Sequence, residues 1–461
     1  MADSTRPGGA GTVPAARPLV GRYRGVVFDL DGVLYLGDQV VPAAPRAVEG
    51  VRKLGLRVGF VTNNAVRSAP TVADKLSRLG VRATAEEVLT SADAVVRLLG
   101  GHDGLAGKRV LALGGPGLLG ALEAAGARLL DPREWRAADL VVVGLDPELT
   151  YDKVRGATLA IAAGARFVGS NADANLPTPE GPWPGAGSVL ALLETATGVR
   201  PAVAGKPEPA IFEAAAARLG TAPLLMVGDR DDTDLAGAKR LGWDVALVLS
   251  GATRPERLLD LPEAPDHLLA DVGGLLEPPG PLIRPAAGDA EAAAARALLG
   301  PGAFQPPRGP GRRDAGELLL VAVERRHDGD ARVVGAVACR QQPAAGRGGC
   351  QDGAGGQGEA LLAGVVVEAG RRGALIGTRL LLAAALALRA RGVTALVARC
   401  GQDQEARVAA GSKGSEAGVR FLTRLGFAPR GDGALLRALR PAARPRPGAE
   451  PEPDVDGQGQ A

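Results

Sequence analysis

The feature that most constrains this chain is a regular alternation of short apolar runs with helical patterns over residues 24–271. The apolar runs read GVVFDL, RVGFVT, RVLALGG, LVVVGL, RFVGSN, LLMVGD and VALVLS. Continuous apolar runs of this length are typical of parallel strands that are buried on both faces of a sheet. Between them lie helical patterns such as APRAVEGVRKLG and AIFEAAAARLG, many of which stop at a glycine. The alternation therefore predicts an α/β fold with a Rossmann-like parallel sheet.

The length and charge of the chain limit the classes of protein it can belong to. A chain of 461 residues predicts two or three domains. Its net charge of +3 provides no large field for nucleic acid or membrane surfaces, and no apolar run reaches the roughly 18 residues needed to span a bilayer. Three scattered cysteines argue for a reducing compartment. We therefore expect a cytoplasmic protein that binds neither nucleic acid nor membranes, with a homo-oligomer left open.

A proline-rich stretch, EPPGPLIRP at residues 277–285, separates two unlike halves. Beyond it we expect a strand, an alanine-rich helix, an antiparallel pair of strands (ELLLVAVERR and ARVVGAVACR), and then a strand, a helix, a strand and a helix, which together indicate an α+β domain. The low-complexity segment 343–360 predicts a flexible loop. The N-terminal lead (1–21), which lacks the apolar core of a signal peptide, and the tail (442–461) are expected to be disordered.

Four polar signals follow apolar runs in the first half, at strand ends where open α/β sheets bind ligands. They are Asp29-Leu30-Asp31-Gly32, Thr62-Asn63-Asn64, Lys206 in AGKPEP, and the acidic stretch Asp229 to Asp234. Each alone has a plain structural explanation, as a turn, a polar strand end, a solvated lysine or an acidic loop. Their occurrence together in one sheet domain favours a single site.

The four signals make chemical sense as a site for a phosphomonoester, which is a dianion that repels carboxylates. A Mg²⁺ ion held by Asp29 and Asp229 would cancel that repulsion and orient the phosphoryl group. A carboxylate is a suitable nucleophile because an aspartyl-phosphate can be both formed and hydrolysed. Asp31 would act as general acid and base and offer its backbone carbonyl to the metal.

The remaining signals would bind the phosphoryl group. Thr62, with the backbone N–H groups near Asn63 and Asn64, would hold its non-bridging oxygens. Lys206 would neutralise the charge that develops in the transition state. We therefore expect a small phosphorylated metabolite as the partner of this site.

The four motifs FDLDGVLYLGD, TNN, GKPEPAIF and GDRDDTDLAGAKRLG resemble, in order, those of the haloacid dehalogenase-like phosphatases over residues 24–271. The resemblance implies that Asp29 is the nucleophile and Asp31 the acid and base. It also implies that Asp229 binds the metal, that Asp234 supports Asp229, and that the cofactor is Mg²⁺.

The interval between the second and third motifs predicts an inserted domain. About 140 residues separate Thr62 from Lys206, whereas a parallel crossover needs only about a dozen. We expect a hydrolase core at 22–85 and 201–276 and an α/β cap at 86–200. This arrangement, with SNADANLPTPEGPWPGAGSV at 170–189, resembles the C2-type cap subgroup of phosphoglycolate, pyridoxal phosphate and nucleotide phosphatases.

Residues 277–441 resemble a GCN5-related N-acetyltransferase domain in the order of their expected elements. The family's acetyl-CoA turn aligns with Arg372 to Gly377, followed by Thr378, and Glu368 is a candidate base. Leucine 375 stands where the turn has its first glycine, and it would obstruct the approach of a phosphate. This departure favours a structural domain, with a retained acetyl-CoA site as the alternative.

The pairing of these two domains resembles that of the actinobacterial glycerol 3-phosphate phosphatases. We therefore expect a Mg²⁺-dependent phosphatase that acts on glycerol 3-phosphate. The alternatives are the same chemistry on 2-phosphoglycolate, pyridoxal phosphate or a nucleotide, a bifunctional phosphatase and N-acetyltransferase, and a non-catalytic sensor of phosphorylated ligands.

Overall fold

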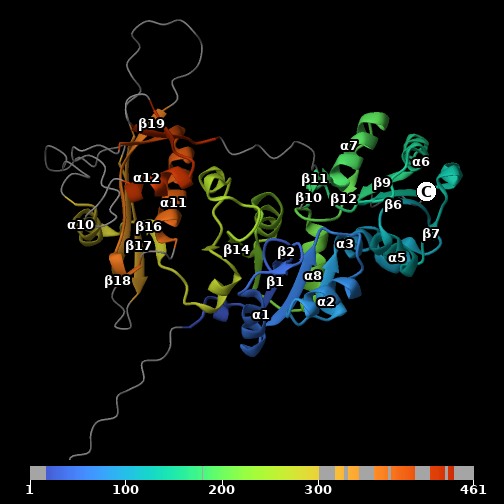
Figure 1. Cartoon of the computed structure of the whole chain (residues 1–461), viewed down its shortest axis with the longest axis horizontal. Helices are drawn as coiled ribbons and strands as arrows, with labels where there is room; N and C mark the ends of the chain where they lie inside the picture. Colours follow the sequence, from blue (N-terminus) through green and yellow to red (C-terminus); the bar gives the residue numbers. More distant parts are fainter. Residues whose placement is uncertain are drawn as a thin grey trace, which may run out of the picture. The chain divides into compact units, whose positions relative to one another are not determined.

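The computed structural model describes residues 17–178, 180–300, 317–325, 331–341, 358–371, 375–399, 416–430 and 434–440. The chain divides into two compact units (Figure 1). Unit 1 comprises the residues through Pro255 together with Pro265–Pro281, and unit 2 comprises Glu256–Ala264 and the residues from Leu282 onward.

Unit 1 contains a six-stranded parallel sheet in the order β15–β14–β13–β1–β4–β5. Its strands are β1 (Gly25–Asp29), β4 (Arg57–Thr62), β5 (Val88–Thr90), β13 (Leu224–Gly228), β14 (Asp244–Val248) and β15 (His267–Leu269). The chain runs outward from β1 to β5 in one direction and from β13 to β15 in the other. The order therefore reverses between β1 and β13, and such a reversal is where doubly wound sheets bind ligands.

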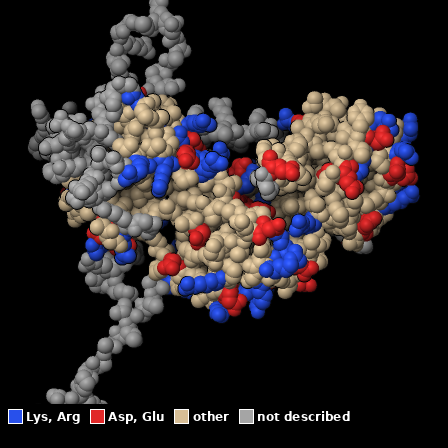
Figure 2. Space-filling view, viewed as in Figure 1, with Lys and Arg blue, Asp and Glu red and all other residues tan. Residues whose placement is uncertain are grey.

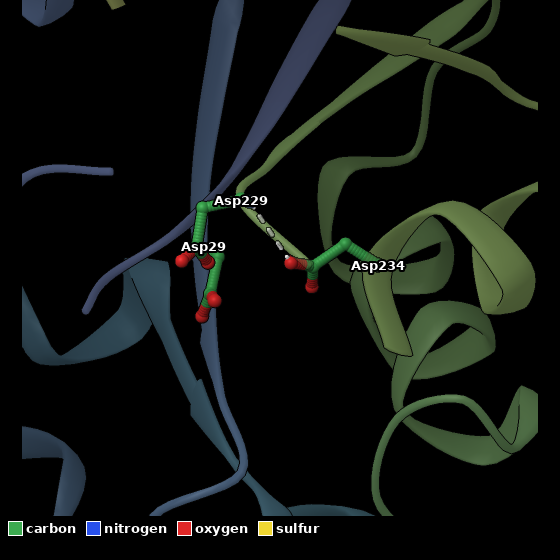
Figure 3. Close-up of side chains that lie close together, drawn as sticks. All are labelled: Asp29, Asp229 and Asp234. Carbon is green, nitrogen blue, oxygen red and sulfur yellow. Dashed lines mark hydrogen bonds between the residues drawn. The ribbon is translucent and has the colours of Figure 1, made fainter. Parts of the chain in front are cut away.

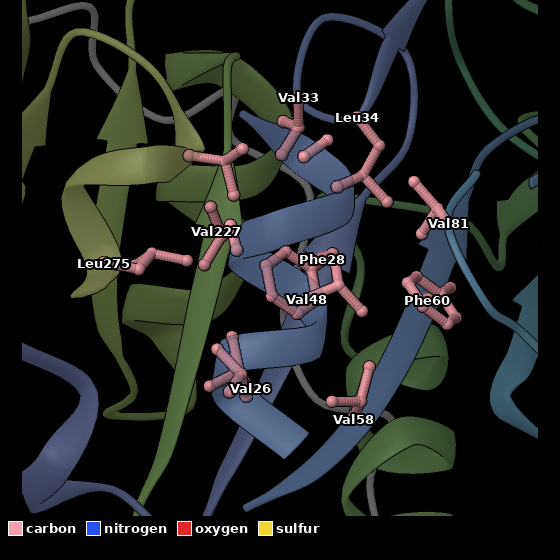
Figure 4. Close-up of a cluster of buried hydrophobic side chains, with 14 of the residues drawn as sticks. Val26, Phe28, Val33, Leu34, Val48, Val58, Phe60, Val81, Val227 and Leu275 are labelled. Carbon is pink, nitrogen blue, oxygen red and sulfur yellow. The ribbon is translucent and has the colours of Figure 1, made fainter. Parts of the chain in front are cut away.

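Helices cover both faces of this sheet because each presents an apolar stripe to it. They are α1 (Ala44–Lys53), α2 (Ala69–Arg78), α3 (Ser91–Leu98), α8 (Pro209–Leu219) and α9 (Ala236–Arg240). In α1 the buried residues Ala44, Ala47, Val48 and Val51 recur at the spacing of one helix face. Figure 4 shows Val48 against Val26 and Phe28 of β1 in the resulting core.

A second parallel sheet, of five strands, lies between the second and third motifs of the chain, in the order β12–β9–β8–β6–β7. Its strands are β6 (Arg109–Leu113), β7 (Arg128–Leu129), β8 (Leu140–Val143), β9 (Arg166–Gly169) and β12 (Ala202–Val203). The helices of this region are α4 (Gly101–Leu105), α5 (Pro116–Ala124), α6 (Tyr151–Ala162) and α7 (Ala186–Thr197), and a hairpin joins β10 (Asn175–Thr178) to β11 (Gly181–Pro184).

The residues at which the chain passes from the six-stranded sheet to the five-stranded sheet and back differ from the expected boundaries of 86 and 200. Strand β5, at Val88–Thr90, pairs with β4 of the six-stranded sheet, so the core sheet extends past residue 85. Strand β12, at Ala202–Val203, pairs with β9 of the five-stranded sheet, which therefore extends past residue 200. Both strands are too short to produce a clear apolar run in the sequence.

Unit 2 is built on a seven-stranded mixed sheet in the order β16–β17–β18–β19–β20–β22–β21. Strands β19 and β20 run parallel, and the other neighbours run antiparallel. The strands are β16 (Leu282–Pro285), β17 (Glu317–Arg325), β18 (Ala331–Gln341), β19 (Gly358–Val367), β20 (Val393–Arg399), β21 (Ala428–Pro429) and β22 (Ala434–Ala438). Figure 1 shows α11 (Ile376–Ala390) and α12 (Glu416–Arg424) on one face of the sheet and α10 (Gly288–Leu299) on the other.

Two expectations about irregular segments need correction. Residues 19–21, expected in the disordered lead, belong to a 3-10 turn, Leu19–Arg22, with Leu19 and Val20 buried in the core of unit 1. Residues 358–360, expected in a flexible loop, begin β19. The rest of that loop, residues 1–16 and the expected tail at 442–461 lie outside the described residues.

The described part of the chain contains no helix that is long and apolar enough to cross a membrane. Charged side chains of both signs are interspersed over the face of unit 1 shown in Figure 2.

The paired rings of Phe28 and Phe60 make the six-stranded sheet sensitive to truncation. Both side chains are fully buried, and their centroids lie 6.0 Å apart. We expect Phe60→Ala to lower the free energy of unfolding by about 3–5 kcal/mol, because it removes buried area and leaves a cavity. Urea unfolding measures this change, with Leu54→Ala as the control, since Leu54 is 46% exposed. A loss for Phe60→Ala no larger than that of the control would contradict this packing.

Candidate active site

The first and fourth motifs meet at one edge of the six-stranded sheet. Asp29 is the last residue of β1, and Asp229 directly follows β13. These strands are parallel neighbours, with Phe28 opposite Val227, so both carboxylates emerge at the same end. Figure 3 shows the two side chains close together, with Asp234 approaching from the helical side. The structure therefore places the predicted carboxylates at the point where the strand order reverses.

Asp234 is fixed by its hydrogen bonds. It lies in a π-helical turn, η4 (Asp231–Leu235), that begins two residues after Asp229. Its Oδ2 accepts from the backbone N–H groups of Asp229 and Arg230, both at 3.2 Å. Its Oδ1 accepts from Nζ of Lys206 at 2.7 Å. The side chain is fully buried, so this set of bonds holds the loop after β13 in one conformation.

Lys206 is buried between two carboxylates. Its Nζ lies 2.7 Å from Oδ1 of Asp29 and 2.7 Å from Oδ1 of Asp234. Burial lowers the pKa of Lys206, but the charges of Asp234 and Asp29 outweigh burial and raise it, so the side chain is an ammonium ion. The lysine follows β12 and thus comes from the end of the five-stranded sheet rather than from a strand of the core sheet.

The cluster carries more negative than positive charge. Asp29, Asp229 and Asp234 each offer a carboxylate oxygen, and these atoms lie within 4.8 Å of one another, whereas Lys206 supplies one positive charge. Burial is the main cause that raises the pKa of Asp29, and burial with the charge of Asp234 raises the pKa of Asp229 to about 6. A divalent cation would balance this excess of two negative charges.

Asp229 has an oxygen available for such a cation. Its Oδ2 accepts from the N–H of Ala252 at 2.5 Å, whereas its Oδ1 is buried and has no hydrogen-bond partner. A buried carboxylate oxygen without a partner is costly unless a ligand satisfies it. Because carboxylate oxygens are the ligands that Mg²⁺ prefers, the residues present fit this ion.

Glycine 32 makes room for Asp229. It has a φ of +82°, and a Cβ at this position would lie 2.2 Å from Oδ2 of Asp229. Any side chain would therefore both strain the backbone and displace the carboxylate. Gly32 of the first motif is therefore needed both for the turn and for the space that Asp229 of the fourth motif occupies.

Asp31 stands apart from the carboxylate cluster. Its side chain is exposed within the cavity, and its backbone bridges to Tyr35 of β2 (Tyr35–Leu36), which forms a hairpin with β3 (Gln39–Val40). Desolvation by the surrounding protein raises the pKa of Asp31, although the positive charges of Lys75 and Lys206 lower it. This raised pKa favours the protonated form that a general acid requires.

The second motif separates into residues with different surroundings. Thr62, the buried last residue of β4, lines the cavity, and its Oγ1 accepts from the N–H of Asn64 at 3.1 Å. The Asn63 side chain grips the backbone of Lys206: its Oδ1 accepts from the N–H at 2.8 Å, and its Nδ2 donates to the carbonyl at 3.0 Å. The side chain of Asn63 is therefore engaged with the backbone of Lys206. The predicted contact of Asn63 with phosphate is left to the backbone N–H of Asn63. Asn64 also lines the cavity, but its Oδ1 accepts from the N–H of Val66.

These residues open into one cavity of about 380 Å³ in unit 1. Its lining includes every predicted site residue of the first half except Asp234. It also includes residues that the sequence did not mark as site residues, among them Leu145, Asn171, Asp173, Leu176 and Arg230. Arg230 lies inside the quoted motif GDRDDTD, and Asn171, Asp173 and Leu176 lie inside the quoted segment 170–189. Their place in these motifs was the available signal.

The predicted acetyl-CoA residues are only partly described. Arg372 lies outside the described residues, and Gly377 and Thr378 lie in the first turn of α11. Leu375 precedes that helix with a φ of +55°, a conformation that leucine rarely adopts. Glu368, the candidate base, instead forms an ion pair at 2.7 Å with Arg332. The acetyl-CoA site stays a prediction.

Comparison with known families agrees with the geometry of unit 1. Residues 26–128 match the family model described as haloacid dehalogenase-like hydrolase, and residues 203–275 match a second model described as HAD-hydrolase-like. The two matches contain all four motifs. The two matches do not cover residues 129–202 or the residues from 276 onward.

Curated relatives and solved structures extend this likeness. The chain is 38% identical over 249 residues to a 5'-nucleotidase of Bacillus subtilis (strain 168), covering 54% of this chain and 95% of that protein. It is 44% identical over 227 residues to the D-glycerol 3-phosphate phosphatase of Mycobacterium tuberculosis (strain ATCC 25618 / H37Rv), covering 49% of this chain and 63% of that one.

A solved glycerol phosphate phosphatase from Mycobacterium tuberculosis, in complex with magnesium, matches with a TM-score of 0.61 and 29% identity over 89% of this chain and 99% of that one. This share is larger than unit 1, so the likeness extends into unit 2. The motifs, the sheet order and the relatives agree: the chain belongs to the haloacid dehalogenase-like hydrolases and is a phosphoric monoester hydrolase.

Proposed function

We propose that this enzyme hydrolyses glycerol 3-phosphate with Mg²⁺ as its cofactor, through an aspartyl-phosphate on Asp29. The observation that carries the proposal is the two buried ion pairs that Lys206 forms with Asp29 and Asp234. They lie beside an oxygen of Asp229 that has no hydrogen-bond partner. The relatives that act on glycerol phosphate, one of them solved with magnesium, support the substrate and the metal.

In the proposed reaction the free carboxylate oxygen of Asp29 forms a bond to phosphorus while the bond from phosphorus to the ester oxygen breaks. Asp31 donates its proton to that oxygen, and glycerol leaves. Asp31 then takes a proton from a water molecule, which attacks the aspartyl-phosphate and releases inorganic phosphate and Asp29. When bound by Asp29, Asp229 and the backbone carbonyl of Asp31, Mg²⁺ supplies positive charge that permits carboxylate and phosphate to approach.

The other residues position these groups. Thr62 and the backbone N–H of Asn63 hold the non-bridging oxygens of the phosphoryl group. Asn64, whose own N–H donates to Oγ1 of Thr62, lines the same part of the cavity. Burial raises the pKa of Asp29, and Lys206 opposes that rise and neutralises charge in the transition state. Asp234 bonds the ammonium group of Lys206 and the backbone N–H of Asp229, and these contacts support the role that the family resemblance implies for it, as a support for the metal ligand Asp229.

Some finer assignments belong to the same proposal. We infer a cap built on the five-stranded sheet, which lies after β5 and ends with β12, and we infer that this cap selects the leaving group over the core of the six-stranded sheet. We also infer that residues 277–441 form an acetyltransferase-like domain, supported by the parallel β19–β20 pair with α11 between them in the chain. Acetyl transfer itself is not favoured, because Leu375 occupies the turn.

The rival substrates are 2-phosphoglycolate, pyridoxal phosphate and nucleotides. Relatives named 5'-nucleotidase and acid sugar phosphatase indicate that related enzymes hydrolyse several classes of phosphate ester. Phosphate release across a panel of these esters and glycerol 3-phosphate tests the substrate. A kcat/KM for glycerol 3-phosphate below that of the rivals would transfer the assignment to the preferred ester.

We expect Asp29→Asn to lower Mg²⁺-dependent phosphate release by at least roughly a thousandfold, because the amide cannot form the aspartyl-phosphate. The Tm should not fall, since the change removes a charge from a crowded anionic cluster. Asp152→Asn is the matched control, because that aspartate is 62% exposed and pairs only with the neighbouring Arg155 in the described structure. Substantial turnover in Asp29→Asn would rule out Asp29 as the nucleophile.

Mg²⁺ binding should strengthen as pH rises through about 6. The pKa of Asp229 is raised to about 6, so a proton competes with the metal below that value. Apparent affinity, measured by calorimetry, should rise roughly tenfold between about pH 5 and about pH 7.

The metal-free protein should behave in the opposite sense. Because the folded-state pKa of Asp229 lies above its unfolded value, the folded protein binds the proton more tightly, so stability falls as pH rises from about 4 to about 6. Asp229→Asn should lose both effects. A pH-independent Mg²⁺ affinity in the unsubstituted protein would exclude Asp229 as a ligand.

A further inference from the structure

The cavity in unit 1 offers two cationic side chains among its described lining residues, Lys206 and Arg230. Lys206 is already bound between Asp29 and Asp234. The group that could contact a second charge on a substrate, beyond its phosphate, is therefore Arg230. What that arginine contacts decides which organic groups the cavity can accept.

Arg230 is held by carboxylates on two sides. Its Nε and Nη2 donate to the two carboxylate oxygens of Asp232, both at 2.9 Å. Its Nη1 lies 3.2 Å from Oδ1 of Asp173, which also lines the cavity. The hydrogen bonds that Arg230 donates to Asp232 are the main cause that raises the pKa of Arg230, and the charge of Asp173 adds to the rise.

Asp173 is itself fixed in place. It lies between β9 and β10, where its backbone N–H donates to Oδ1 of Asn171 at 3.1 Å. Its Oδ2 accepts from Nδ2 of Asn63 at 3.0 Å, so one oxygen is held by Asn63 and the other faces Arg230. The carboxylate cannot swing away from Arg230 without losing the bond from Asn63.

We propose that Asp173 is a specificity residue that acts with Asp232 to neutralise Arg230, so that the enzyme accepts phosphomonoesters with an uncharged hydroxylated group and discriminates against esters that carry a carboxylate. This inference rests on the proposed phosphatase site and names the class of its leaving group. A carboxylate entering the cavity would meet the charge of Asp173, and like charges at short range oppose binding.

The rest of the described cavity lining contains no further cation that would pair with a carboxylate. Leu36, Leu145 and Leu176 line it with apolar groups, and burial of a charge against apolar groups is unfavourable. Two further cations, Lys75 and Arg67, influence the pKa of Asp31 but do not line the cavity. Lys75 lies over the ring of Tyr35, 3.8 Å from its centroid.

Two matched pairs of substrates test the inference. Glycerol 3-phosphate and 3-phosphoglycerate differ only by a hydroxymethyl group in place of a carboxylate. The pair 2-hydroxyethyl phosphate and 2-phosphoglycolate differs in the same way. The unsubstituted enzyme should show a kcat/KM at least roughly tenfold higher for the hydroxymethyl ester of each pair. Equal values within both pairs would overturn the inference.

The second pair separates this inference from the choice of glycerol 3-phosphate. Poor hydrolysis of glycerol 3-phosphate together with a preference for 2-hydroxyethyl phosphate over 2-phosphoglycolate would refute the proposed substrate and support the role of Asp173. Hydrolysis of none of the four esters would overturn both.

Asp173→Asn tests the residue directly, because the amide keeps an oxygen for Asn63 and removes the charge that faces Arg230. Within each pair, the ratio of kcat/KM for the carboxylate ester to that for the hydroxymethyl ester should rise by roughly tenfold. Asp173→Asn combined with Arg230→Gln should lose this gain. An unchanged ratio in the single variant would leave Asp173 with only a structural role, and a gain that persists in the double variant would refute neutralisation of Arg230.

Discussion

The crowding of three carboxylates around one buried ammonium group is the interaction on which the organisation of unit 1 depends. Lys206 lies 2.7 Å from both Asp29 and Asp234, and Asp229 lies in the same cluster with one oxygen unpartnered. Such a cluster is unfavourable unless it is held rigidly and completed by a cation. The same imbalance makes it useful, because a site that requires positive charge will bind a divalent ion and, through that ion, a phosphate dianion.

The geometry of the sheet explains how this cluster can exist. Parallel strands β1 and β13 deliver Asp29 and Asp229 to one edge at the reversal of the strand order. Lys206 does not come from a strand of this sheet, because it follows β12 of the five-stranded sheet. The amide of Asn63 then fixes the Lys206 backbone at both its N–H and its carbonyl. The ammonium position is therefore set by a residue of the core sheet although the lysine belongs to a segment that leaves the other sheet.

Much of this arrangement could be predicted from the sequence because its signals are local. The alternation of apolar runs and helices predicted the α/β fold of unit 1, and the four motifs identified residues that the structure brings together. The side-chain role of Asn63 and the pairing of Asp173 with Arg230 could not be predicted, because they join residues far apart in the chain; Asn63 and Asp173 are 110 positions apart. Strand β5 was missed for a different reason, since three residues carry too little pattern.

Specificity and catalysis share one chain of contacts in this site. Arg230 contacts Asp173, Asp173 accepts from Asn63, and Asn63 holds the backbone of Lys206, whose ammonium group lies against Asp29. Asp173, in the segment after β9, is thereby connected to the proposed nucleophile through two intervening residues, Asn63 and Lys206. Asp173 uses one oxygen for Asn63 and the other for Arg230. A substitution of Asp173 that alters the charge of the cavity wall therefore also alters the contact that helps Asn63 to position Lys206. The charge preference of the cavity and the geometry of the ion pair are therefore constrained together.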